Sequence, residues 1–248
     1  MKKVAIYNLK GGVGKTATAA NLAYCAANSG LKTLLLDLDP QGASSFYFKV
    51  KPSKKFSAEK FAHRKKIFKN LKETDYPNLD LLPSDFSFRS LDLIFDEEKK
   101  RERTLNKILS SFQSSYDLVI MDCPASIGVD AENVFYAADV LLIPVIPTIL
   151  SIETLNRVLA FLKELGHQKK KTVGFFAQVD GRKKMHKDTV FNHTIKDEPF
   201  LKSTIPFSSE IEKMGIYRAP VTARHPNCRS SKAFFALWQE FKKKHLKK

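Results

Sequence analysis

Short apolar runs alternate with longer stretches of helix-forming residues along most of the chain. The apolar runs are rich in β-branched residues, and several, such as residues 140–143, are continuously apolar rather than alternating. Continuous runs are typical of parallel strands that helices cover on both faces. The pattern predicts strands over residues 3–8, 32–37, 78–82, 117–122, 139–146, 172–179 and 203–206.

The longer stretches predict helices over residues 15–28, 103–113, 151–165, 208–214 and 231–243. Strands that alternate with helices favour an α/β fold, a doubly wound and mostly parallel sheet with helices on both faces. With 248 residues, 43% of them apolar, the chain is expected to form one domain over 1–248. Residues 49–76 are the least regular part, and we interpret them as a basic insertion.

A glycine-rich segment joins the first predicted strand to the first predicted helix. It reads Leu-Lys-Gly-Gly-Val-Gly-Lys-Thr over residues 9–16. Glycines let backbone N–H groups close around phosphate oxygens, and the helix N-terminus adds partial positive charge. Lys15 would then reach the β- and γ-phosphates, and the Thr16 hydroxyl would ligate Mg²⁺. The strand–turn–helix context predicts a phosphate-binding loop.

This loop carries a second lysine, Lys10, and has Leu9 where the strict motif has glycine. A lone lysine is usually a solvated surface residue. Here it lies among the phosphate-binding amides, where a second cation would be drawn to the nucleotide. Lys10 is therefore the distinguishing residue of a variant phosphate loop.

Aspartates end two of the predicted strands. Asp37 and Asp39 follow the apolar run of residues 34–36, and Asp122 follows residues 118–121. The carboxyl ends of parallel strands meet at one sheet edge, so we expect all three beside the phosphate loop. Mg²⁺ prefers oxygen ligands and keeps several waters, so carboxylates often hold it through its hydration shell.

Positive charge is clustered. The chain has 42 Lys and Arg against 26 Asp and Glu, a net charge of +16. The excess lies in residues 49–72, 168–187 and 224–248, which hold ten, seven and eight basic residues and one acidic residue each. Clustered basic charge indicates a polyanionic ligand, either nucleic acid or an anionic membrane face; a merely solvated surface is the alternative.

No apolar run approaches the roughly 20 residues of a membrane span, and the first strand reaches the phosphate loop too early for a signal peptide. We therefore expect a cytoplasmic protein. The three cysteines, Cys25, Cys123 and Cys228, suit a reducing compartment and are interpreted as small, mostly buried hydrophobic residues.

Three motifs together resemble the ParA/MinD family of deviant P-loop ATPases. They are Lys-Gly-Gly-Val-Gly-Lys-Thr at 10–16, Asp-Leu-Asp-Pro-Gln-Gly at 37–42 and Asp-Cys-Pro at 122–124. Within this family the chain is most similar to small ParA-type partition ATPases that lack an N-terminal DNA-binding domain. A weaker likeness covers most of the remaining chain. Ala17 and Ala125 depart from residues frequent in the family, and the insertion is not a family hallmark.

The resemblance implies an ATPase that uses ATP and Mg²⁺ and turns over slowly until a partner stimulates it. It implies a nucleotide-sandwich homodimer in which Lys10 of each subunit reaches phosphates bound by the other. Asp39 would position or activate the attacking water, so Lys10 and Asp39 are the candidate catalytic residues. Thr16, Asp37 and Asp122 would hold hydrated Mg²⁺. The candidate nucleotide-binding residues are Lys10, Gly11, Gly12, Val13, Gly14, Lys15, Thr16, Ala17 and Pro206, with Val179 and Ile205 near the adenine.

The resemblance also suggests a DNA-binding role. Because the phosphate loop begins at residue 9, we expect no N-terminal helix-turn-helix domain. A short ParA-type protein would bind double-stranded DNA without sequence preference, through basic surfaces of the dimer. A ParB-like or adaptor protein would activate hydrolysis, and the protein would associate with the nucleoid. The candidate DNA contacts are Lys202, Lys213, Arg218, Arg224, Arg229 and Lys232.

The alternative is a MinD-like membrane-associated positioning ATPase. It would need an amphipathic C-terminal helix, and Phe234, Phe235, Leu237, Trp238 and Phe241 do fall at helical spacing. Such a stripe is more often part of a core. Beyond it lies only a polybasic tail, residues 242–248, with one apolar residue, which is too few to anchor alone.

Overall fold

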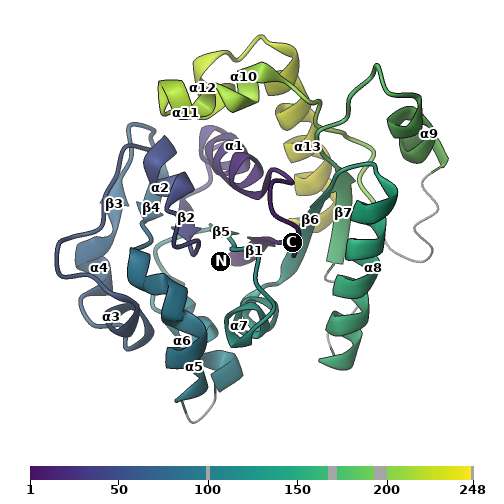
Figure 1. The fold of residues 1–248 in the computed structure, drawn as a ribbon. Helices are drawn as coiled ribbons and strands as arrows, with labels where there is room; N and C mark the ends of the chain where they lie inside the picture. Colours follow the sequence, from purple (N-terminus) through teal and green to yellow (C-terminus); the bar gives the residue numbers. More distant parts are fainter. Residues whose placement is uncertain (99–100, 167–171, 193–199, 247–248) are drawn as a thin grey trace.

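One sheet organises the molecule, and the computed structural model describes it within residues 1–98, 101–166, 172–192 and 200–246 (Figure 1). Its strands are β1 (Lys2–Ile6), β2 (Thr33–Asp37), β3 (Lys72–Glu73), β4 (Leu79–Leu82), β5 (Leu118–Asp122), β6 (Val140–Val145) and β7 (Thr172–Phe176). Their order is β3-β4-β2-β5-β1-β6-β7. All neighbouring pairs are parallel except β3 with β4, which is antiparallel. The predicted α/β, mostly parallel fold is confirmed.

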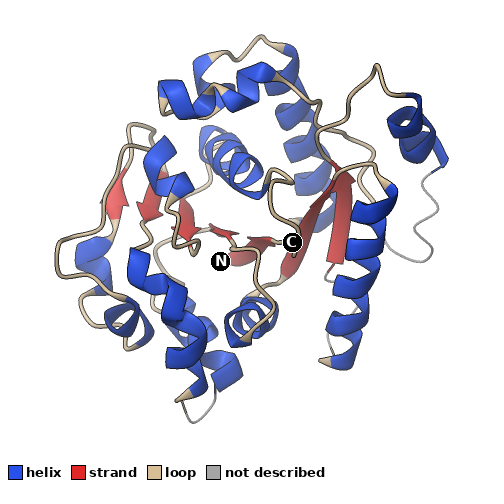
Figure 2. Ribbon diagram, viewed as in Figure 1, coloured by secondary structure: helices blue, strands red, loops and turns tan. Residues whose placement is uncertain are grey.

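Helices cover both faces of the sheet (Figure 2). Those of five or more residues in the first half are α1 (Lys15–Asn28), α2 (Ala43–Tyr47), α3 (Ala58–Ala62), α5 (Leu91–Asp96) and α6 (Thr104–Ser110). The second half adds α7 (Val129–Ala137), α8 (Ile149–Glu164), α9 (Lys184–Asn192) and α13 (Arg229–His245). Shorter helices are α4 (Ile67–Asn70), α10 (Ser209–Glu212), α11 (Met214–Tyr217) and α12 (Val221–Arg224), and 3₁₀ turns are η1 (Phe86–Ser90) and η2 (Arg101–Arg103).

The two faces bury separate hydrophobic clusters. Successive residues of β1 alternate between them, so that Ala5 packs on one face and Val4 and Ile6 on the other. Helices α5 to α8 cover the first face, whereas α1 and α13 cover the second (Figure 1). Because both faces are covered, the central strands are apolar throughout, which is why their sequences lack alternation.

Two predicted elements are wrong in detail. Residues 203–206 do not form a strand, and Pro206 makes only an isolated parallel bridge with Val179. Proline has no N–H to donate, so regular pairing cannot continue through it. The predicted helix over 208–214 is divided into the two short helices α10 and α11. Helices α2, α3, α4, α5, α7, α9 and α12 were not predicted from the sequence.

The insertion is ordered and contributes to the core. It contains α3, α4 and β3, and its Phe56, Phe61 and Ile67 are buried in the cluster that also holds α5 and α6. Cys25 and Cys123 are buried and Cys228 is partly buried, all as free thiols. Within the part of the chain that the structure describes, no helix combines the length and apolar character that a membrane span requires.

Candidate nucleotide-binding site

The glycine-rich loop connects β1 to α1 at the carboxyl edge of the sheet. Gly12 and Gly14 adopt φ angles of +72° and +91°, which L side chains rarely adopt. The Gly14 carbonyl accepts the N–H of Thr18 at 2.9 Å and so starts α1. The loop therefore presents its backbone beside a helix N-terminus, the geometry that binds phosphate.

Lys15 is buried at the start of α1, and its Nζ donates to the Lys10 carbonyl at 3.1 Å. Burial lowers the pKa of this amine, and the nearby carboxylates of Asp122 and Asp39 act in the opposite direction. The Lys15 ammonium is thus held inside the loop and away from water. A bound phosphate would supply the interactions that this ammonium no longer makes with water.

Lys10 is held by neighbouring strands and by the start of α8. Its N–H donates to Asn8 Oδ1 at 2.9 Å, while Asn8 Nδ2 donates to the Pro144 carbonyl at 2.8 Å. The Lys10 Nζ donates to Ser151 Oγ at 3.0 Å. The side chain therefore lies against the first turn of α8.

The two strand-end aspartates lie side by side. Asp37 of β2 and Asp122 of β5 are paired in register, and both are fully buried. Asp37 Oδ2 accepts the Ser45 N–H at 2.8 Å and its hydroxyl at 2.6 Å. Asp122 Oδ2 accepts the Ser44 hydroxyl at 2.8 Å. The first turn of α2 therefore clamps both carboxyl groups.

Asp122 Oδ1 is buried and has no hydrogen-bond partner among the described residues. Burial raises the pKa of Asp122 and of Asp37, and their mutual proximity raises that of Asp122 further. A divalent cation would relieve both effects, and Thr16 stands next to Asp122. No three His, Cys, Asp or Glu side chains in the described ranges are grouped to ligate a metal directly. The donors therefore fit an ion that keeps most of its waters, as Mg²⁺ does.

Asp39 lies two residues beyond β2 and is only partly buried. Its N–H donates to Asp37 Oδ1 at 3.3 Å, and its own Oδ1 accepts the Gln41 N–H at 2.9 Å. The structure thus brings Asp37, Asp39 and Asp122 to one sheet edge beside the loop.

A cavity of about 310 Å³ opens next to the loop. Gly12, Val13, Gly14 and Ala17 line one side, and Pro206 lies on another. Val179 is not in the lining, although it pairs with Pro206 and holds that segment in place. The cavity is mostly apolar and has the size of a nucleoside pocket.

Several site residues have no signal in the sequence. Gln178 lines the cavity with a left-handed φ of 53° and donates to the Gly12 carbonyl. Ser44 and Ser45 belong to α2, which the apolar pattern does not predict. Ser151 lies in a predicted helix, yet spacing alone does not connect it to Lys10. Their roles depend on distant segments meeting in the fold.

The candidate DNA contacts lie on the C-terminal segment and do not form one tight cluster. Lys213 is paired with Glu210 at 2.7 Å, and the Arg224 guanidinium lies 5.4 Å from the Tyr217 ring centre. Arg229 and Lys232 are exposed on the first turns of α13. The Lys202 N–H donates to the Glu240 carboxylate. Glu240 lies on α13 eight residues beyond Lys232, which is about 12 Å along the helix.

Arg218 has two interactions with α2. Its Nε donates to the Phe46 carbonyl at 3.1 Å, and its guanidinium lies 4.5 Å from the Phe46 ring centre. Of the other basic clusters, residues 169–171 and 247–248 lie outside the described ranges.

Residues 1–175 match the family model described as an AAA domain. The chain is 29% identical over 245 residues to the chromosome-partitioning ATPase Soj of Treponema pallidum (strain Nichols), covering 96% of each chain. It is 32% identical over 160 residues to the sporulation initiation inhibitor protein Soj of Bacillus subtilis (strain 168), covering 64% of this chain and 63% of that one. A solved plasmid partition protein from Borrelia burgdorferi B31, bound to AMPPNP, has the same fold, with a TM-score of 0.85, 23% identity and coverage of 98% and 99%.

Proposed function

This chain belongs to the AAA domain family as a small P-loop ATPase of the ParA/MinD type, and from that premise we propose that it works as an ATP-driven positioning switch. Its reaction is hydrolysis of ATP to ADP and phosphate, and its cofactors are ATP and Mg²⁺. In this proposal ATP joins two protomers, the dimer binds double-stranded DNA without sequence preference, and hydrolysis releases it. A ParB-like or adaptor protein stimulates hydrolysis, and the cargo is a chromosome, a plasmid or a protein assembly.

One observation supports the assignment of the nucleotide-binding site. Buried Asp37 and Asp122, aligned in adjacent strands, meet the glycine loop where Asp122 Oδ1 has no hydrogen-bond partner in the part of the chain that the structure describes. With Thr16 they would hold the hydrated cation, which neutralises charge on the phosphates when bound. Lys15 and the loop amides would orient the phosphates, and Asp39 would orient the attacking water. Phosphoryl transfer depends mainly on such positioning and charge stabilisation.

Lys10 would act across the dimer. Its ammonium contacts Ser151 at the open sheet edge, so leaving for a partner's phosphate costs it one hydrogen bond to a neutral hydroxyl. A hydrogen bond to phosphate, in which both partners carry charge, is stronger than that bond. The gain favours an ATP-bound dimer and is lost when the γ-phosphate leaves.

Light scattering with two lysine variants tests the switch. In the hydrolysis-blocked Asp39→Ala protein, ATP and Mg²⁺ should double the molar mass. Adding Lys15→Ala should abolish nucleotide binding, whereas adding Lys10→Ala should leave monomers that still bind ATP. Lys187→Ala, an exposed lysine on α9, is the matched control. An Asp39→Ala protein that stays monomeric with ATP and Mg²⁺ rejects the proposed dimer.

The membrane alternative has little support in α13. Of the side chains that would face a bilayer, Phe234, Leu237, Trp238 and Phe241 are at most 1% exposed and belong to the core cluster under α1. The fifth, Phe235, is partly buried and packs against the same cluster. A helix that contributes its apolar stripe to the core cannot also insert that stripe into lipid. DNA is therefore the favoured polyanion.

A further inference from the structure

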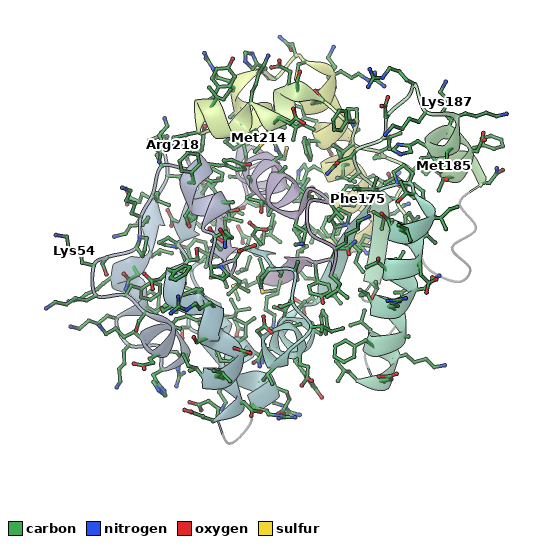
Figure 3. The ribbon with its side chains drawn as sticks, in the orientation of Figure 1. Lys54, Phe175, Met185, Lys187, Met214 and Arg218 are labelled. Carbon is green, nitrogen blue, oxygen red and sulfur yellow. The ribbon has the colours of Figure 1, made fainter. Side chains whose placement is uncertain are left out.

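Most of the charged side chains of the basic insertion are exposed to solvent. Residues 49–72 carry ten Lys and Arg and one acidic residue, Glu59. Lys51, Lys54, Lys55, Lys65 and Lys69 are exposed, and Lys54 extends away from the body of the molecule (Figure 3). Within the described ranges the only lysine or arginine of this segment in an ion pair is Lys49, which pairs with Asp75, and His63 Nδ1 lies 3.5 Å from Glu98. The positive charge is largely unneutralised by the protein itself.

The backbone that carries these lysines is fixed. Phe56, Phe61 and Ile67 are buried beneath it, and the Ala58 N–H donates to Ser87 Oγ at 2.8 Å. Buried Asn70 accepts from the Ser53 hydroxyl through its side-chain oxygen and donates to the Lys66 carbonyl at 3.1 Å. A fixed backbone limits the ordering cost of binding to the lysine side chains.

The insertion begins next to Arg218, one of the candidate DNA contacts of the C-terminal segment. The Phe46 carbonyl accepts two N–H groups at 3.1 Å each, one from the Lys49 backbone and one from the Arg218 guanidinium. Arg218 also lies over the Phe46 ring. Helix α11 therefore packs against α2, and Arg218, which directly follows α11, lies next to the Lys49 backbone at the start of the insertion. Arg218 and Lys54 lie on the same side of the molecule in Figure 3.

We propose that residues 49–69 form a second contact surface for the phosphate backbone of double-stranded DNA, adjacent at Arg218 to the candidate DNA contacts of the C-terminal segment. This proposal rests on the proposed DNA-binding function and adds to it a surface on the β3–β4 edge of the sheet. The surface is suited to phosphates rather than to a bilayer, because its apolar residues are mostly buried and Phe68 is its one exposed large hydrophobic side chain within the described ranges.

Two charge-matched triple variants test this surface. The first changes Lys51, Lys54 and Lys55 to Gln. The control changes Lys2, Lys32 and Lys163 to Gln. These lysines are also exposed, but Lys2 lies on β1, Lys32 directly before β2, and Lys163 on α8. Both lower the net charge by three, so their difference isolates local contacts from the overall field. Circular dichroism checks that each variant folds.

Binding to a mixed-sequence DNA duplex is measured with AMPPNP and Mg²⁺ from about 50 to 200 mM salt. In a plot of log binding constant against log salt concentration, the slope of the insertion variant should be less steep than that of the control. The difference should be about 0.9 to about 2.7, for one to three lost phosphate contacts. Equal slopes and affinities for the two triple variants would overturn the inference. So would a loss of binding to anionic phosphatidylserine vesicles with DNA binding at the control value.

A third variant separates this inference from the function on which it rests. Arg229→Gln with Lys232→Gln removes charge from the C-terminal surface alone. If this double variant loses DNA affinity while the insertion variant matches its control, the insertion surface is rejected and DNA binding stands. If the unaltered protein does not bind the duplex with AMPPNP, both proposals fail.

Discussion

At the scale of single residues, Ser45 makes two hydrogen bonds to the Asp37 carboxylate. Burial raises the pKa of this carboxyl group, and the hydroxyl and N–H of Ser45 work against that rise. Removing the hydroxyl should leave more Asp37 protonated and therefore a weaker site for Mg²⁺. Loss of such a supporting hydrogen bond typically costs about 10- to 100-fold in metal affinity.

We therefore predict that Ser45→Ala raises the Mg²⁺ concentration needed for half-maximal binding of a fluorescent ATP analogue by about tenfold or more. The difference in Mg²⁺ midpoint between Ser45→Ala and the original protein should become smaller as pH rises, because Asp37 then ionises even without the Ser45 hydroxyl. Ser45→Thr, which keeps a hydroxyl, should recover most of the affinity. Ser110→Ala, exposed on α6, is the control. An unchanged Mg²⁺ midpoint in Ser45→Ala would exclude Asp37 from the cation site.

The same residues show what a sequence can predict of this site. Asp37 and Asp122 were placed together because each ends an apolar strand, and parallel strands share one carboxyl edge. Ser45 and Gln178 were not found. Serine and glutamine after a strand have no distinctive pattern, and their partners are 8 and 166 residues away in the sequence. Only tertiary packing defines those contacts.

At the scale of elements, Glu240 joins α13 to the segment after β7. Its carboxylate accepts the N–H groups of Lys202 and Ser203 at 2.9 and 2.8 Å, the Ser203 hydroxyl at 2.8 Å and Lys244 Nζ at 2.7 Å. Burial acts to raise the pKa of Glu240, but these hydrogen bonds together lower it to about 2. The ionised form therefore stabilises the fold.

The sign of the pH effect follows from proton binding. Between about pH 2 and the ordinary glutamate pKa near 4.3, the unfolded chain holds more protons at this site than the folded one. The contribution of Glu240 is complete above that range and is lost as pH falls through about 2. Glu240→Gln should lower the free energy of unfolding at pH 7 by about 2 to 3 kcal/mol.

Urea unfolding at a series of pH values measures this contribution. The difference between the original protein and Glu240→Gln should narrow steadily from pH 5 toward pH 2. Glu164→Gln, exposed at the end of α8, should have little effect at any pH. A Glu240→Gln difference that stays constant with pH would mean that packing, and not the ionised carboxylate, holds the segment to α13.

Element prediction succeeded where burial on both faces leaves a continuous apolar run, as in β2, β5 and β6. It failed at residues 203–206, where Pro206 limits pairing to one bridge. Helix α7 was missed because it begins within a loop at Gly128 and is only nine residues long. Short helices depend on packing more than on their own propensity.

At the scale of the whole molecule, the net charge of +16 acts on two equilibria in opposite directions. Two protomers of like charge repel each other, so self-repulsion opposes the proposed dimer. The same charge attracts DNA and releases counterions when it binds. Salt screens the repulsion and also reduces the gain from counterion release.

We predict that raising salt from about 50 to 200 mM tightens ATP-dependent dimerisation of Asp39→Ala a few-fold and weakens its DNA binding at least about tenfold. Light scattering without DNA measures the first, and fluorescence anisotropy with a labelled duplex measures the second. The control variant with Lys2, Lys32 and Lys163 changed to Gln should reduce both responses, because it lowers the overall charge. If salt weakened the dimer as well, the contact of each Lys10 with its partner's phosphates would outweigh the repulsion between subunits, and local charge rather than net charge would govern assembly.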